Sequence, residues 1–199
     1  MKLQFKSLIR SGMLLAIFAL ALGSCKSKKN ATPIEQSTGA KEISVPFSTK
    51  EFYSDKDNFR AKSSGNSPDL QTAKKIALQN AKSEMAGMIQ TTIKKVTDQY
   101  TQQRTVGNQQ DFSNKFEEIA REVTNQELVD IKMLGEKLFK ETNNTYTYWI
   151  AIEANKQAVL NGIDKGIAAN KKIEQDYDKK KFEEIFNAEM EKLAKERGY

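Results

Sequence analysis

The sequence contains no histidine and only one cysteine among its 199 residues. Without histidine, the chain cannot form a Ser-His-Asp triad, use histidine as a general base or build most zinc sites. A single cysteine cannot form an internal disulfide. The sequence also lacks a glycine-rich phosphate loop and a serine nucleophile elbow. We therefore expect a protein that is not an enzyme and that uses no cofactor and no metal.

An excess of charge of one sign is also absent once the amino terminus is set aside. The net charge is +6, from 32 basic and 26 acidic residues. The first 24 residues hold three of the basic residues and no acidic one, which leaves +3 for the remainder. Because domains that bind nucleic acid usually show a strongly basic face, we expect no nucleic acid partner.

A positively charged and then apolar segment opens the chain. Lys2, Lys6 and Arg10 precede an unbroken apolar run from Met13 to Leu22. A membrane-spanning helix needs about 20 apolar residues, so this shorter run is typical of a secretory signal peptide instead. We therefore expect residues 1–24 to be a signal peptide that is removed on export.

The apolar run closes with the four residues Leu22, Gly23, Ser24 and Cys25. These residues resemble the lipobox of bacterial lipoprotein precursors, in which small residues precede the cysteine that is lipidated. The resemblance implies cleavage before Cys25 and several acyl chains on that residue, which together give durable anchoring to a membrane. Lys26 stands where an aspartate retains such proteins in the inner membrane. The resemblance therefore implies an outer-membrane location, facing the periplasm.

The region after the lipidation site has the composition of a linker. Residues 25–50 are rich in lysine, serine, threonine and asparagine, and apolar periodicity is weak. Within this tether, Ile43–Phe47 could dock as an edge strand, because proline such as Pro46 is tolerated there. We expect the folded domain to span residues 51–163 and a charged helical tail to span residues 164–199.

Apolar periodicity predicts an α+β domain with the element order β-α-α-β-β-α. A strand around residues 58–65 precedes a helix for which Ser67 is the expected N-cap. From Leu70 onward, apolar residues recur every three or four positions over about 30 residues, which is typical of a long amphipathic helix. A second helix is expected over about 111–125. The long helix requires a partner for its apolar face, and a small antiparallel sheet is the one available.

A β-hairpin and a third helix complete this order. Residues 128–141 alternate between apolar and polar, and the phase changes at Gly135, which indicates a bulge. A turn over 142–145 leads to the clearest strand of the chain, over 146–153. The third helix is expected to begin near Asn155.

The final strand of the hairpin carries a candidate contact residue. Tyr146 and Tyr148 share one face of this strand, whereas Trp149 points to the opposite face. We expect the tyrosines to lie in the core. One face of a small antiparallel sheet is often exposed, so Trp149 is a candidate for contact with a ligand or a partner.

Three features of this region resemble the small outer-membrane lipoproteins of the Lpp-twenty type, a family related to the N-terminal domain of flagellar assembly protein T. They are a strand running into a turn at 60–66, the helix entry AKKIALQNAKSEMAGMI at 73–89, and the hairpin segments LVDIKMLGEKLF and TYTYWIAIEANKQAV. The resemblance covers about residues 57–160. It implies an α+β domain with a helix packed on a sheet, and it implies no reaction, cofactor or catalytic residue.

The charged tail carries a narrow apolar stripe that includes Phe182 and Phe186. Such a stripe is typical of a surface helix that docks on its own domain, or of a helix that pairs with another helix. Phe182 and Phe186 are therefore candidates for contact with an envelope protein or for self-association. The sequence as a whole predicts a lipid-anchored envelope protein that serves as an interaction or structural module. The alternative is a module that binds peptidoglycan or polysaccharide around Trp149.

Overall fold

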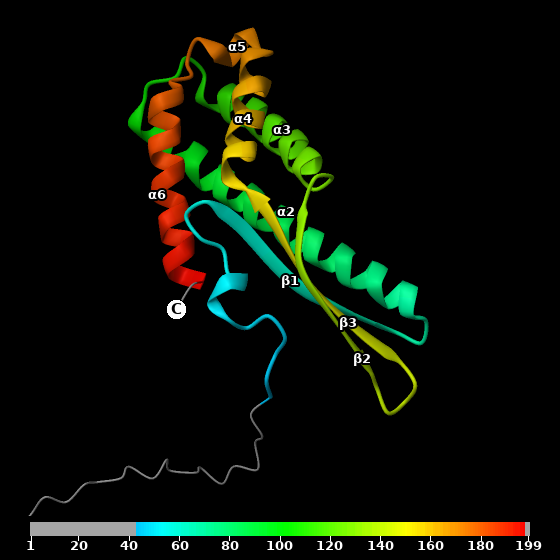
Figure 1. The fold of residues 1–199 in the computed structure, drawn as a ribbon. Coiled ribbons are helices and arrows are strands. Elements are labelled where there is room, and N and C mark those ends of the chain that lie inside the picture. The colour runs from blue at the N-terminus through cyan, green and yellow to red at the C-terminus, as the bar shows by residue number, and fades with distance from the viewer. Residues whose placement is uncertain (1–42, 198–199) are drawn as a thin grey trace, which may run out of the picture. The chain divides into compact units, whose positions relative to one another are not determined.

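The computed structural model describes residues 43–197. The predicted signal peptide, the lipidation site at Cys25 and most of the predicted tether lie outside the described residues. The described part is an α+β fold in which helices cover one face of a three-stranded antiparallel sheet (Figure 1). This confirms the predicted order β-α-α-β-β-α and the additional C-terminal helix. The elements are β1 (Asn58–Ser67), α2 (Leu70–Gln103), α3 (Gln109–Glu127), β2 (Lys132–Lys140), β3 (Tyr146–Asn155), α4 (Lys156–Ala168), α5 (Lys171–Glu174) and α6 (Lys179–Arg197).

The strand β3 is central in the sheet, with β1 on one side and β2 on the other. Both neighbours run antiparallel to β3, and Ala61 and Met133 both lie opposite Ile152. The register of β2 shifts between Met133 and Gly135, which confirms the predicted bulge. The turn between β2 and β3 places Asn144 in the left-handed region with φ 63°, a conformation that asparagine tolerates better than most residues.

The long helix α2 packs its alanine-rich first half directly on the sheet. Ala73, Ala77 and Ala81 are fully buried, as the predicted apolar stripe requires. Gly65 of β1 makes this close approach possible, because a Cβ at that position would lie 2.5 Å from both the Ala73 carbonyl oxygen and the Ala77 nitrogen. The side chain of Asp69 caps the helix by accepting a hydrogen bond from the Thr72 N–H at 2.7 Å.

The expected cap, Ser67, is instead the last residue of β1. The prediction was wrong because the strand extends two residues further than its alternation suggested. This extension leaves Asp69 as the first residue that can turn its side chain onto the helix end.

The helices α3 and α4 pack closely through two glycines of α4. A Cβ at Gly162 would lie 2.8 Å from Cγ1 of Val123, and a Cβ at Gly166 would lie 2.5 Å from Cγ2 of Ile119. The backbone of α4 at these two glycines therefore packs directly against the side chains of α3. The two glycines lie about one helical turn apart, and no helix contact was predicted from this spacing.

The C-terminal helix α6 docks on the domain, which is the first of the two arrangements expected for the charged tail, and it contributes to the same core. Phe182, Phe186 and Met190 are fully buried in the same cluster as the sheet residues. The second half of α2 extends past the sheet, and α6 covers its remaining apolar face (Figure 1). The Phe182 ring lies 5.9 Å from the Tyr100 ring of α2. The apolar stripe therefore packs on its own domain, and the alternative, pairing with another helix, is excluded while α6 is docked.

Polar contacts hold α6 against α2 near both ends of α6. The Tyr100 hydroxyl donates to the Asp176 carbonyl at 2.8 Å and accepts from the Asp178 N–H at 2.7 Å, which secures the turn before α6. Further along, the buried Glu189 carboxylate pairs with Lys95 of α2 at 3.1 Å. Burial by itself raises the pKa of Glu189, but hydrogen bonds from Lys95, Lys192 and Gln99 outweigh it and lower the pKa below its usual value.

Candidate functional site

The candidate site is the outer face of the sheet, which we define as the face opposite α2. Its side chains follow from the strand register, because residues that lie opposite one another share a face. They include the predicted contact residue Trp149 and the charged residues that surround it. The face is made up of Arg60, Lys62, Ser64 and Asn66 on β1, Thr147, Trp149, Ala151 and Glu153 on β3, and Lys132, Gly135, Lys137 and Phe139 on β2.

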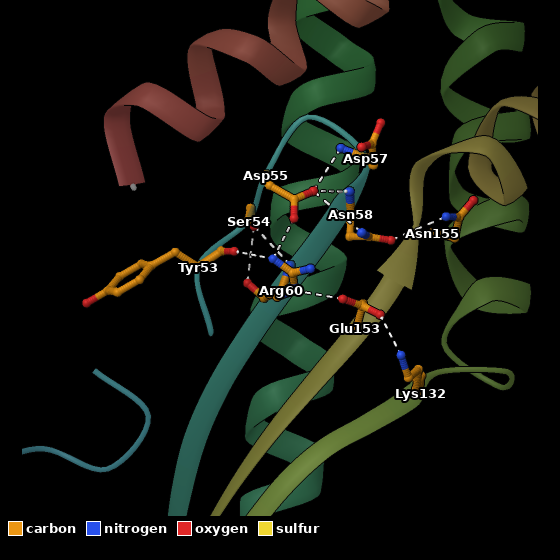
Figure 2. Close-up of polar contacts among 9 residues, drawn as sticks. All are labelled: Tyr53, Ser54, Asp55, Asp57, Asn58, Arg60, Lys132, Glu153 and Asn155. Carbon is orange, nitrogen blue, oxygen red and sulfur yellow. Dashed lines mark hydrogen bonds and ion pairs between the residues drawn. The ribbon is translucent and has the colours of Figure 1, made fainter. Parts of the chain in front are cut away.

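One end of the outer face is closed by an ion-pair network centred on Arg60 (Figure 2). The Arg60 Nε donates to Glu153 on the neighbouring strand at 2.7 Å. Its Nη1 lies 2.7 Å from the Asp55 carboxylate and donates to the Tyr53 carbonyl at 2.8 Å. Glu153 also pairs with Lys132 of β2 at 3.3 Å. The guanidinium therefore connects the segment before β1 to the central strand β3.

The pKa of Asp55 shows how strongly this network holds its carboxylate. Burial raises the pKa of Asp55, but the Asp57 N–H and the Arg60 guanidinium together lower it below its usual value. The carboxylate is thus kept ionised and engaged with its partners. Such a group is suited to bracing the fold and poorly suited to proton transfer near neutral pH.

The middle of the outer face is covered by the segment around Phe47. The Phe47 ring is buried, and a Cβ at Gly135 would lie 2.9 Å from it. Lys62 donates to the Phe47 carbonyl at 2.6 Å. Ala151 points to the outer face but is only 1% exposed, as expected beneath such a cover. Phe47 has a φ of 60°, which is rare for a bulky residue and is maintained here by its surroundings.

This arrangement corrects the expectation for Ile43–Phe47. The segment forms no strand and does not extend the sheet. Its contact with the protein is made by a side chain lying across the outer face. Among the described residues, packing on the domain therefore already includes Phe47, which lies inside the range 25–50 that was predicted to be a tether.

Trp149 remains half-buried at the other end of the outer face. In the register it lies between Ser64 of β1 and Lys137 of β2. Phe139 is its diagonal neighbour on the same face and is 44% exposed. On the opposite face, Tyr148 is buried under α2. The structure thus confirms that Trp149 and the adjacent tyrosine point to different faces of β3.

A second polar cluster, on the helix-covered face, was not anticipated from the sequence. The Glu136 carboxylate of β2 accepts a hydrogen bond from the Tyr148 hydroxyl and pairs with Lys74 of α2 at 3.0 Å. Hydrogen bonds from Tyr148 and Lys74 lower the pKa of Glu136, whereas burial and Glu136 raise the pKa of Tyr148. Both pKa values move away from neutrality, so neither group is tuned for acid–base catalysis at physiological pH. The cluster instead braces β2 against α2.

The two phenylalanines predicted as partner contacts lie far from solvent. Phe182 and Phe186 are fully buried on the face of α6 that packs on the domain, and the Phe182 ring lies 5.0 Å from the Phe116 ring. A partner cannot reach either residue while α6 is docked. The predicted contact role is therefore wrong for these two residues, because the domain itself uses the apolar stripe.

A scan of protein-family models, a search of curated proteins and a search of solved structures each found no match for this chain. The resemblance to Lpp-twenty-type lipoproteins therefore stays a prediction. Across residues 43–197, no helix is long and apolar enough to cross a membrane, and no group of acidic residues is placed to hold a metal ion. The fold and the outer face thus define an α+β domain in which ion pairs around Arg60 and Glu136 connect neighbouring elements.

Proposed function

We propose that this protein is a non-enzymatic, lipid-anchored protein of the bacterial cell envelope that acts as an interaction or structural module at the outer membrane. The observation that carries this proposal is the sequence Leu22–Cys25 at the end of a short apolar run. A lipid on Cys25 would hold the mature chain at a membrane surface, and several acyl chains make such anchoring durable.

The described domain supports the interaction part of this proposal. Its strongest charge clusters, around Arg60 and Glu136, are paired internally and brace elements of the fold. In contrast, three large apolar side chains of β2 are exposed to solvent at the edge of the sheet, and edge strands of this kind can pair with another chain. These side chains are Met133, Leu138 and Phe139.

Metabolic labelling with radioactive palmitate tests the anchor. The wild-type chain is expected to incorporate label and to sediment with membranes, whereas Cys25→Ser should lose both properties. Cys25→Ser combined with Ser27→Cys provides a matched control, because it restores a cysteine outside the required position and should remain unlabelled. Absence of label on the wild-type chain would contradict the anchoring proposal.

Trp149 supports a second candidate function, the binding of peptidoglycan or polysaccharide. The indole is half-buried beside Lys137, and the exposed Phe139 is its diagonal neighbour on the same face. Aromatic rings with one accessible face and a polar surround are suited to stacking on sugars.

Sedimentation with purified sacculi tests this second candidate. If Trp149 contributes a stacking contact, Trp149→Ala should weaken binding about tenfold or more, as truncation of an aromatic anchor commonly does. Trp149→Phe should retain most of the binding, because it keeps an aromatic face. Equal sedimentation of the wild type and Trp149→Ala would exclude this role for Trp149.

A further inference from the structure

We propose that β2 pairs edge to edge with β2 of a second copy of this chain, so that the sheets of two copies join into one. The inference rests on the described domain and is independent of the lipid anchor. It assigns the self-association expected from the sequence to a different surface, since the apolar stripe of α6 is buried.

The two edges of the sheet differ in how their backbone groups are satisfied. At the β1 edge, the Ser54 hydroxyl accepts from the Arg60 N–H at 2.9 Å and donates to the Arg60 carbonyl at 3.3 Å. Further along this edge, the Asn80 side chain donates to the Ser64 carbonyl at 2.9 Å. The edge formed by β1 is therefore closed in part by the chain itself, at Arg60 and Ser64.

The backbone groups that point outward from β2 follow from the same contacts. Because the Arg60 backbone faces Ser54, the backbone groups of the opposite residue, Glu153, point toward β2. Along each strand, the backbone groups of successive residues point alternately to one neighbour and to the other. Applied to the register of β2, this alternation makes the backbone groups of Glu136, Leu138 and Lys140 point away from β3. Within residues 43–197, these outward groups have no hydrogen-bond partner on another element. The edge formed by β2 is therefore open.

The open edge also presents apolar side chains. Leu138 is 47% exposed, Phe139 is 44% exposed, and the two point to opposite faces of the sheet. The hairpin of β2 and β3 projects beyond the helices at this end of the domain (Figure 1). Unpaired, partly apolar edge strands are templates for pairing with another strand.

Charge complementarity supports β2 of another copy as the second strand. In an antiparallel pair with Leu138 on the twofold axis, Glu136 of each copy, which also pairs with Lys74 of its own chain at 3.0 Å, lies opposite Lys140 of the other. Lys137 of each copy then lies opposite Phe139 of the other, on the outer face. Opposite charges and cation–aromatic pairs placed across two strands are both favourable. Moving the axis to Glu136 or Lys140 places like charges opposite each other instead.

Sedimentation velocity of the purified full chain in mild detergent tests the pairing. All chains carry Cys25→Ser, so that clustering of lipids does not contribute and a failed anchor does not affect the result. The chain that carries only Cys25→Ser, the background chain, is expected to form dimers. Adding Leu138→Asp should weaken the dimer about tenfold or more, because it places two carboxylates opposite each other on the twofold axis. Val129→Asp is the matched control, because Val129 is 76% exposed and precedes β2. A monomeric background chain, or equal dimerisation of Leu138→Asp, would overturn the proposal.

A charge-exchange experiment tests the register. Glu136→Lys and Lys140→Glu should each be monomeric when alone, because each places like charges opposite one another. An equimolar mixture should form the heterodimer, in which both pairs again combine opposite charges. Since Glu136→Lys also removes the internal pair with Lys74, recovery of the dimer in the mixture is the result that tests the register. Circular dichroism confirms that each variant is folded before mixing. Failure of the mixture of folded variants to dimerise would contradict the pairing of Glu136 with Lys140.

Discussion

Replacing Phe182 with alanine is expected to lower the free energy of unfolding by about 3–5 kcal/mol. The Phe182 side chain is fully buried and lies within an aromatic cluster contributed by α2, α3 and α6. Its ring centroid is 5.0 Å from that of Phe116 and 5.6 Å from that of Tyr177. Truncation removes these contacts and leaves a cavity that the surrounding rings cannot fill.

Urea unfolding of the purified chain, followed by circular dichroism, measures this loss. Phe182→Leu keeps an apolar side chain of intermediate size, so its unfolding midpoint should lie between those of the wild type and Phe182→Ala. Unchanged midpoints for both variants would mean that α6 is not docked as described. The expected loss is a large share of the total stability, since domains of this size are stable by only about 5–15 kcal/mol.

Replacing Gly65 with alanine is expected to cost about 3 kcal/mol, at the upper end of the range for overpacked sites. The added Cβ would lie 2.5 Å from the Ala73 carbonyl oxygen and 2.7 Å from the Cβ of Ile76. Backbone atoms of α2 cannot move aside as the end of a flexible side chain can. The helix would have to move away from β1, and the burial of Ala73 and Ala77 would be weakened.

Gly87→Ala provides the matched control, with an effect of opposite sign. Gly87 lies in the interior of α2, is exposed, and would accept a Cβ with no heavy atom within 4 Å. Since alanine favours the helix over glycine, this substitution should stabilise the chain by up to about 1 kcal/mol. Urea midpoints that fall for Gly65→Ala and rise for Gly87→Ala are expected. A neutral Gly65→Ala would show that α2 does not approach β1 this closely.

Features that depend on local periodicity could be predicted from the sequence. The buried stripe of α2, the bulge at Gly135 and the opposite orientations of Tyr148 and Trp149 all follow from the spacing of neighbouring residues. The helix start was displaced by two residues, because Ser67 and Asp69 are both good caps and only the length of β1 decides between them.

Features that depend on contacts between distant residues could not be predicted in this way. The apolar stripe of α6 indicated a docked helix or a paired one, but it did not identify Tyr100 as the residue against which Phe182 packs. The cover formed by Phe47 lies in a segment with linker-like composition, and it depends on space above Gly135. The brace between Arg60 and Glu153 likewise joins residues that only the sheet register brings together.

The same distinction applies to the candidate site. The orientation of Trp149 could be predicted because it follows from strand alternation. The open edge of β2 could not be predicted in this way, since it becomes apparent only beside the edge of β1, which Ser54 and Asn80 close in part. Whether an edge strand can pair with a strand of another chain thus depends on the whole sheet, and the sequence of that strand alone does not show it.

The central claim is that this protein acts from a membrane surface to which Cys25 attaches it. Mass spectrometry of the mature chain, purified from membranes of the cells that produce it, tests this claim most directly. We expect Cys25 to be the first residue and to carry the added mass of acyl chains on its sulfur and amino group. A mature chain that begins at another residue, or that begins at an unmodified Cys25, would contradict the claim.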